Sequence, residues 1–181
     1  GDLMEGISHE AIALAGHLKL NKLIFLYDDN GITIDGPISL TDNVDQVARF
    51  KAHGWDARRI DGHDPKAIAN AIRRAQKSDK PTMIACKTTI GFGSPNRAGT
   101  SKAHGEPLGA DELAATKQTL GWNHGPFEIP DDILQAWRKV GKRGRRANND
   151  WRKRLAALPE AQRGEFQRRV IDRTLPGGVD E

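Results

Sequence analysis

The 181-residue sequence contains a single cysteine and no long apolar run, and each absence excludes a class of protein. Because Cys86 has no second cysteine to pair with, an intramolecular disulfide is impossible, which favours a reducing compartment such as the cytoplasm. No stretch approaches the roughly 18 consecutive apolar residues of a membrane-spanning helix, so we expect no membrane partner. Cys86 itself lies in an apolar run, where a thiol is more often a core side chain than a nucleophile.

Apolar residues are also scarce, at 37% of the chain, and they thin out after about residue 138. The length suits one domain with a core and a tail rather than two ordinary domains. The sequence opens at Gly1 without an initiator methionine, so we expect an internal piece of a longer protein. We therefore predict a well-folded region in the first two thirds and a less apolar segment after it.

Positive charge is concentrated in residues 138–154, which carry nine Lys and Arg side chains against Asp150 alone. Such a stretch raises the alternative of a basic nucleic-acid-binding module. The stretch lacks interleaved exposed aromatics and any known binding module, and basic runs on an exposed helix are usually solvated. Nucleic acid is therefore the less favoured partner.

Helical and strand patterns alternate along the first 90 residues. We predict, in chain order, a helix over residues 4–20, a strand over 23–27, a helix over 44–50, a strand over 55–60, a helix over 64–77 and a strand over 81–88. The continuous apolar run of residues 23–27 indicates a parallel strand that is buried on both faces. The alternation predicts an α/β fold, a parallel sheet with helices on both faces, in which ligands bind beyond the carboxyl ends of the strands.

Residues 90–109 hold five glycines and two prolines with almost no apolar periodicity. So long a loop inside a compact domain is usually functional or disordered. After it we predict a helix over residues 111–120 and another that begins at residue 130. A further helix around residues 151–158 would extend along a neighbour.

Two segments carry residues suited to a phosphate group and a divalent cation. Residues 1–6 place small residues directly before a helix, where free N–H groups and the helix dipole favour an anion. Residues 28–32 follow a strand and offer an amide oxygen and main-chain carbonyls, which are ligands that Mg2+ accepts. Each segment alone is weak evidence for a binding site, because turns favour Asp, Asn and Gly for conformational reasons.

Together the two segments resemble the thiamine diphosphate motif, which begins Gly-Asp-Gly and ends in Asn roughly 25 to 30 residues later. The sequence is most similar to the transketolase family. The similar segments are residues 3–11, 15–18, 27–36, 87–94, 99–109 and 126–130. The resemblance implies a partial thiamine diphosphate-binding fold. It makes residues 1–125 part of the diphosphate- and Mg2+-binding domain, and residues 126–181 a basic helical linker toward a missing pyrimidine-binding domain.

The start of the chain departs from the family pattern. Aligned without a gap, Gly1 is the second glycine of Gly-Asp-Gly, so the metal-binding aspartate would precede it. Asp2 is therefore not expected to be that ligand. The early histidines, the pyrimidine-binding domain with its catalytic glutamate and the C-terminal domain are absent, so we expect the chain alone to be inactive.

Carried over residue by residue, the resemblance implies a set of cofactor contacts. Asn30 would bind Mg2+ through its side chain, and Ile32 through its main-chain carbonyl. Gly1 would contact the diphosphate through its backbone. Ile34 and Ile90 would shape the apolar cofactor cavity. The implied cofactors are thiamine diphosphate and Mg2+, for which Ca2+ or another divalent cation could substitute.

Among the histidines, the resemblance assigns a role to His104 alone. It would lie near the diphosphate and the donor sugar, where it would bind and polarise the substrate as a catalytic residue. Glu5 would lie at the interface of a homodimer. The remaining histidines, which we expect to be structural or solvated, are His9, His17, His53, His63 and His124.

The resemblance implies transfer of a two-carbon ketol unit from a ketose phosphate to an aldose phosphate, as in the pentose phosphate pathway and the Calvin cycle. Sugar phosphates would be the substrates. An alternative of the same class is a dihydroxyacetone synthase, which shares these motifs but accepts formaldehyde. The basic nucleic-acid-binding module remains the alternative of a different class.

Overall fold

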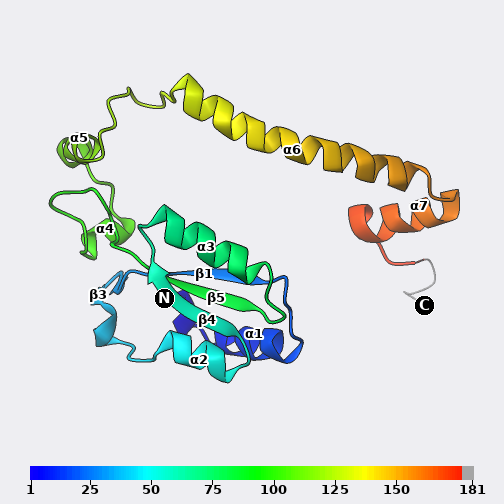
Figure 1. Cartoon of the computed structure of the whole chain (residues 1–181), viewed down its shortest axis with the longest axis horizontal. Coiled ribbons are helices and arrows are strands. Elements are labelled where there is room, and N and C mark those ends of the chain that lie inside the picture. Colours follow the sequence, from blue (N-terminus) through cyan, green and yellow to red (C-terminus); the bar gives the residue numbers. More distant parts are fainter. Residues whose placement is uncertain (177–181) are drawn as a thin grey trace. The chain divides into compact units, whose positions relative to one another are not determined.

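The computed structural model describes residues 1–176, which form two compact units (Figure 1). The first unit is Gly1–Asn123, and the second begins at His124.

The first unit is built on a three-stranded parallel sheet, which confirms the predicted α/β class. The strands are β1 (Ile24–Asp29), β4 (Asp56–Asp61) and β5 (Thr82–Lys87), in the order β1-β5-β4. Asp29 and Asp61 both lie opposite Lys87, so the three carboxyl ends finish level with one another. A short antiparallel pair, β2 (Ile32–Thr33) with β3 (Gly36–Pro37), follows β1 directly.

Helices cover both faces of this sheet, as predicted (Figure 1). On one face pack α1 (Gly6–His17) and α2 (Gln46–Ala52), and on the other packs α3 (Pro65–Ala75). The alternation of side chains along β5 separates the two cores, because Met83 and Ala85 join the first and Ile84 the second. Cys86 is half-buried on the α3 side, where burial raises the pKa of its thiol.

Local sequence signals account for several element ends. The Asp64 carboxylate caps α3 by accepting the Lys66 N–H at 2.8 Å, and Pro65 occupies the first turn. Gly54 follows α2 with a φ of 84°, a conformation that glycine adopts without strain. Both element ends therefore follow from residue types that favour these positions.

A close approach joins α1 to the segment after α2. The Trp55 indole donates to the Ile12 carbonyl at 2.9 Å. A Cβ at Gly16 would come within 1.8 Å of the His53 carbonyl oxygen, so only glycine fits there. The glycine at position 16 therefore allows α1 to approach the backbone at His53.

Two sequence expectations about the first 30 residues are wrong in detail. Of the helix expected over residues 4–20, α1 occupies residues 6–17 only, and Met4 ends a separate 3-10 turn, η1 (Asp2–Met4). The strand expected to be buried on both faces lies at an edge of the sheet, where Leu26 is 51% exposed. An apolar run predicts burial, but within residues 1–176 this strand pairs with β5 alone.

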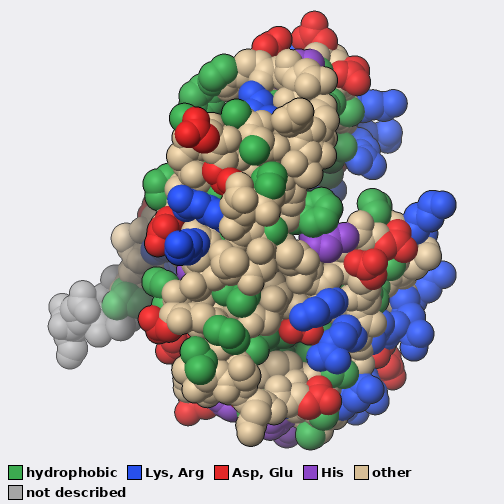
Figure 2. Space-filling view, turned by 90° about the vertical axis from the view of Figure 1, so that its left-hand side faces the viewer, with side chains coloured by type: hydrophobic (Ala, Val, Ile, Leu, Met, Phe, Trp, Pro, Cys, Tyr) green, Lys and Arg blue, Asp and Glu red, His purple; other side chains and the backbone are tan. Residues whose placement is uncertain are grey.

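The remaining elements of the first unit are helical. A 3-10 turn, η2 (Ile38–Leu40), follows the β2–β3 pair. After β5, the glycine-rich segment contains one helical turn, α4 (Lys102–Gly105), before α5 (Ala110–Thr119). The loop predicted over residues 90–109 is thus not wholly without secondary structure. Figure 2, in which the left-hand side of Figure 1 faces the viewer, shows hydrophobic side chains scattered among charged side chains of both signs.

The second unit contains one long helix, α6 (Asp131–Ala156), then α7 (Glu160–Phe166) and a π-helical turn, η3 (Gln167–Asp172). The two helices predicted from residues 130 and 151 are therefore one. The Trp151 and Phe166 rings lie 6.0 Å apart and join α6 to α7. None of the helices in residues 1–176 combines the length and apolar character needed to cross a membrane.

Candidate functional site

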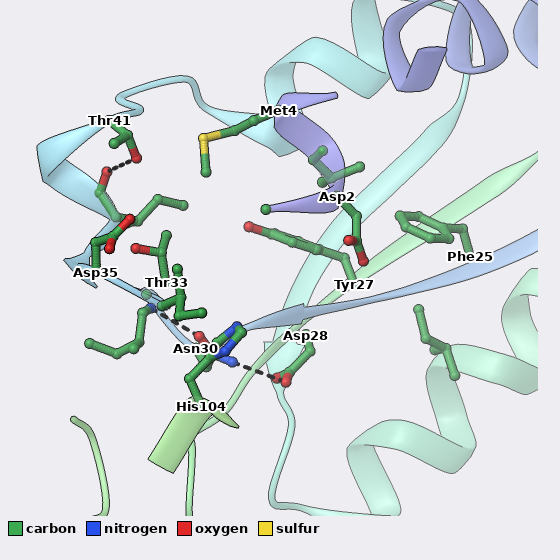
Figure 3. A pocket seen from close by; sticks show the side chains of 17 residues that line it. Asp2, Met4, Phe25, Tyr27, Asp28, Asn30, Thr33, Asp35, Thr41 and His104 are labelled. Atoms are coloured by element: carbon green, nitrogen blue, oxygen red, sulfur yellow. Dashed lines mark hydrogen bonds between the residues drawn. The ribbon is translucent and has the colours of Figure 1, made fainter. Parts of the chain in front are cut away.

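A cavity of about 630 Å³ opens where the carboxyl end of β1 meets the β2–β3 pair (Figure 3). Its walls come from η1, the end of β1, the β2–β3 pair and α4. This is the position that a parallel α/β sheet offers to ligands, beyond its strand ends. Of the residues singled out from the sequence, the cavity brings together Gly1, Asn30, Ile32, Ile34 and His104.

The Asn30 side chain is held by two hydrogen bonds. Its Nδ2 donates to Asp28 Oδ2 at 3.1 Å, and its Oδ1 accepts the Ile32 N–H at 2.9 Å (Figure 3). These two bonds fix which end of the amide is oxygen. A carbonyl oxygen has two lone pairs, so Asn30 Oδ1 retains capacity to bind a cation.

Asp28 is a site residue whose individual role the sequence left undefined. Its second oxygen, Oδ1, accepts the Thr88 hydroxyl, so the carboxylate links the Asn30 amide to the end of β5. The adjacent Asp29 instead pairs with Arg59 at 3.0 Å and is not among the residues that line the described cavity. The sequence offered no signal for this role, because residues 28–32 were expected to follow the strand, in a turn that favours Asp for conformational reasons.

Tyr27 adds a phenol to the cavity wall. Its pKa is raised above 10 first by burial and then by the carboxylates of Asp29, Asp42 and Asp28. The phenol therefore stays protonated at neutral pH, and it can donate a hydrogen bond to an anion or a carbonyl.

The turn after β1 shapes the apolar part of the wall. The Ile38 N–H donates to the Gly31 carbonyl at 2.9 Å, and Gly31 has a φ of 75°. Ile34 lines the cavity with 68% of its surface exposed. Ile90 is half-buried and is not among the residues that line the described cavity. Its carbonyl accepts the Gly99 N–H at 2.9 Å, at the base of the glycine-rich segment.

His104 reaches the cavity from α4, more than 70 residues along the chain from Asn30. Figure 3 shows its imidazole projecting into the space beside Asn30. The side chain is exposed, and its backbone N–H donates to the Ser101 carbonyl at 2.9 Å. An exposed imidazole held on a helical turn can donate to, or accept from, a ligand in the cavity.

Glu5 and His63 lie outside this cavity. Glu5 is exposed and precedes α1 without a side-chain capping bond. His63 Nε2 accepts the Thr89 N–H at 2.9 Å, and its ring stacks on Phe92 at 4.2 Å between centroids. His63 therefore has the structural role expected of it.

The donor set fits part of a Mg2+ shell. Within residues 1–176, no three His, Cys, Asp or Glu side chains gather closely enough to hold a metal ion. Asn30 Oδ1 and the main chain of Ile32 are hard oxygen donors beside the cavity, and Mg2+ commonly completes its shell with phosphate oxygens and water. The site therefore suits a cation that arrives with a phosphorylated ligand.

Comparisons with known proteins show which family this chain resembles. The family model described as "Transketolase, thiamine diphosphate binding domain" matches residues 1–176. A transketolase of Sinorhizobium medicae is 53% identical over 165 residues, covering 91% of this chain and 24% of its own.

Solved structures give the same result for the fold. Transketolase from Leishmania mexicana matches with a TM-score of 0.86 and 34% identity, covering 97% of this chain and 27% of its own. A Pichia stipitis transketolase variant in complex with fructose 6-phosphate matches with a TM-score of 0.84 and 37% identity, with the same coverage. This chain thus spans about a quarter of the length of these relatives. The family model and the structural matches together show that the chain belongs to the transketolase family and carries sequence of its thiamine diphosphate-binding domain.

Proposed function

We propose that this chain forms part of the diphosphate- and Mg2+-binding domain of a transketolase, over residues 1–125, followed by a linker over residues 126–181. The proposed enzyme transfers a two-carbon ketol unit from a ketose phosphate to an aldose phosphate in the cytoplasm. The observation that carries the proposal is the Asn30 amide, which is oriented by two hydrogen bonds in a cavity that His104 also lines.

In this proposal the cofactor is held by residues around the turn after β1. Asn30 Oδ1 and the Ile32 carbonyl bind Mg2+, the Gly1 backbone contacts the diphosphate, and Ile34 provides an apolar wall. Thiamine diphosphate, when bound, supplies the nucleophilic carbon and the electron sink that ketol transfer requires. We also propose that Ile90 contributes to the apolar cofactor cavity, next to the glycine-rich segment whose Gly99 N–H its carbonyl accepts.

His104 binds the substrate in the proposed enzyme. An imidazole N–H directed at a substrate oxygen stabilises the negative charge that develops there during the reaction. The proposal of a sugar phosphate substrate is supported by the related Pichia stipitis protein, whose structure is a complex with fructose 6-phosphate.

Two exposed features fit a homodimer. Glu5 lies exposed before α1, and β1 exposes Leu26 at the edge of the sheet. The assembled enzyme is defined here as this chain together with the remaining parts of a transketolase. We propose that a second subunit covers Glu5 in the assembled enzyme.

The test is ketol transfer by the assembled enzyme, with a ketose phosphate donor and an aldose phosphate acceptor. His104→Ala should lower kcat/KM by about 100- to 1000-fold, the loss typical of removing one donor to a developing oxyanion. The melting temperature should stay unchanged, because the His104 side chain is exposed. Preference for formaldehyde as acceptor would instead favour a dihydroxyacetone synthase, and wild-type turnover in the variant would remove His104 from the reaction.

A further inference from the structure

The glycine-rich segment that leads to His104 is anchored by a carboxylate on α5. Glu112 Oε1 accepts the Ser94 hydroxyl and the Asn96 N–H, the latter at 2.9 Å, and Oε2 accepts Asn96 Nδ2 at 2.8 Å. Ser94 is buried, with 3% of its surface exposed. These hydrogen bonds lower the pKa of Glu112 to about 2, so the carboxylate is charged at neutral pH. Glu112 therefore joins α5 to Ser94 and Asn96 in the glycine-rich segment.

The C-terminal end of α5 contacts the same glycine-rich segment. A Cβ at Gly93 would come within 2.7 Å of the Leu120 side chain, so Leu120 packs directly on the Gly93 backbone. Gly93 has a φ of 90°, which favours glycine. The helix thus contacts residues 93–96 near both of its ends.

The anchored segment in turn contacts both sides of α4. A Cβ at Gly91 would come within 2.8 Å of Ala103 Cβ, directly before His104. Arg97 Nη1 donates to the Pro107 carbonyl at 3.0 Å and lies 3.5 Å from Glu106 Oε2, just after α4. The chain on either side of His104 therefore contacts Gly91 and Arg97, which flank the residues 93–96 that Glu112 and Leu120 contact.

We propose that Glu112 is a positioning residue, which fixes residues 91–97 and thereby holds α4 with the His104 imidazole in the cavity. The importance of that position for the reaction rests on the function proposed above, whereas the anchoring itself does not. Glu112 touches neither the cavity nor a ligand site, and it acts only through the segment between them.

The anchoring is tested on the full chain by NMR of ¹³C-labelled histidines, with the His104 signal assigned by His104→Gln. Glu112→Ala should shift or broaden the His104 signal and should accelerate tryptic cleavage after Arg97 and Lys102 several-fold. The signals of His9 and His17, on α1, should stay in place and report an intact core. Asp111→Ala is the matched control, because Asp111 is the neighbouring first-turn carboxylate of α5 and has no side-chain hydrogen bond or ion pair among the described residues.

Two further variants cover the case in which Glu112→Ala does not fold. Ser94→Ala and Asn96→Ala remove donors to Glu112 while leaving α5 unchanged, and each should reproduce part of the shift and of the faster cleavage. An unchanged His104 signal with unchanged cleavage in the folded variants would overturn the proposal.

The catalytic consequence is tested by a double-mutant cycle in the assembled enzyme. Glu112→Ala should lower kcat/KM by about 10- to 100-fold, as misplacement of a reacting group does. In a His104→Ala background the same change should cost less than about threefold, because both variants remove one interaction. A full additional loss in that background would contradict action through His104. If His104→Ala alone has no effect while the NMR result holds, the proposed function of His104 fails and the anchoring stands.

Discussion

Replacing Asp28 by Ala tests whether the carboxylate beside Asn30 prepares the proposed metal ligand. The substitution removes the acceptor of Asn30 Nδ2 at 3.1 Å and the acceptor of the Thr88 hydroxyl. Asn30 Oδ1 would keep the Ile32 N–H at 2.9 Å, so the amide would be held by one bond instead of two. Its oxygen would then sample orientations that do not face a cation.

The size of the effect follows from the lost bond. A hydrogen bond to a charged acceptor contributes about 1.5 to 3 kcal/mol, and Asp28 is exposed, which favours the lower end. A loss of about 1.4 kcal/mol corresponds to tenfold weaker binding. Loss of a group that orients a metal ligand typically weakens metal affinity by about 10- to 100-fold. We therefore expect Mg2+ to bind about tenfold more weakly in the presence of thiamine diphosphate.

The assay is calorimetric titration of Mg2+ into the assembled enzyme with saturating thiamine diphosphate. Asp29→Ala is the matched control, because Asp29 pairs with Arg59 at 3.0 Å and does not line the described cavity. Equal weakening by both variants would mean that general negative charge, rather than orientation of Asn30, governs binding. Unchanged affinity in Asp28→Ala would refute the reasoning.

Three further predictions concern stability and completeness. Gly16→Ala forces a Cβ to within 1.8 Å of the His53 carbonyl oxygen, so the free energy of unfolding should fall by about 1 to 3 kcal/mol in urea titrations, and a gain would contradict the packing. The pKa of Glu112 is lowered to about 2 in the folded chain from an ordinary 4.5, so its contribution to stability is complete above pH 4.5 and is lost as pH falls toward 2. Unfolding curves from pH 6 to 2.5 should therefore show a smaller acid loss for Glu112→Gln than for wild type, and parallel curves would show that this carboxylate does not contribute. The chain alone should show no ketol transfer, because residues 1–176 hold only part of a metal shell, and measurable turnover by the purified chain would contradict this.

Local patterns were sufficient to predict the fold class. The helix predicted over residues 64–77 corresponds to α3, which begins at Pro65 directly after the Asp64 cap. The strand of residues 81–88 was predicted from an apolar run, and β5 occupies the centre of the sheet. Such signals act within a few residues, so a sequence shows them directly.

The features that were missed depend on contacts between distant residues. The apolar run of β1 predicts burial on both faces, but the number of neighbouring strands is a property of the whole sheet. The bond from Asn96 to Glu112 spans 16 residues and belongs to no motif. Likewise, the sequence of α4 has no helical periodicity of its own. Its position is supported by the contact of Ala103 with Gly91 and by the hydrogen bond from Arg97 to the Pro107 carbonyl.

The site shows the same division. Asn30 and His104 were singled out by the resemblance to the transketolase family, and both line the cavity. The partner of Asn30 was not predicted, because a turn that favours Asp and Asn does not distinguish an orienting carboxylate from a solvated one. Ile90 was assigned to the cavity wall by the same resemblance, whereas the described cavity does not include it.

The most direct test of the central claim is Mg2+ binding by the assembled enzyme with Asn30 replaced by Ala. The substitution removes the oriented amide oxygen of the cavity while leaving Asp28 and the Ile32 main chain in place. Calorimetric titration with saturating thiamine diphosphate should show Mg2+ affinity reduced by more than the approximately tenfold loss expected for Asp28→Ala, with an unchanged melting temperature for the apoprotein. Wild-type Mg2+ affinity in Asn30→Ala would remove Asn30 from the metal site and contradict the account.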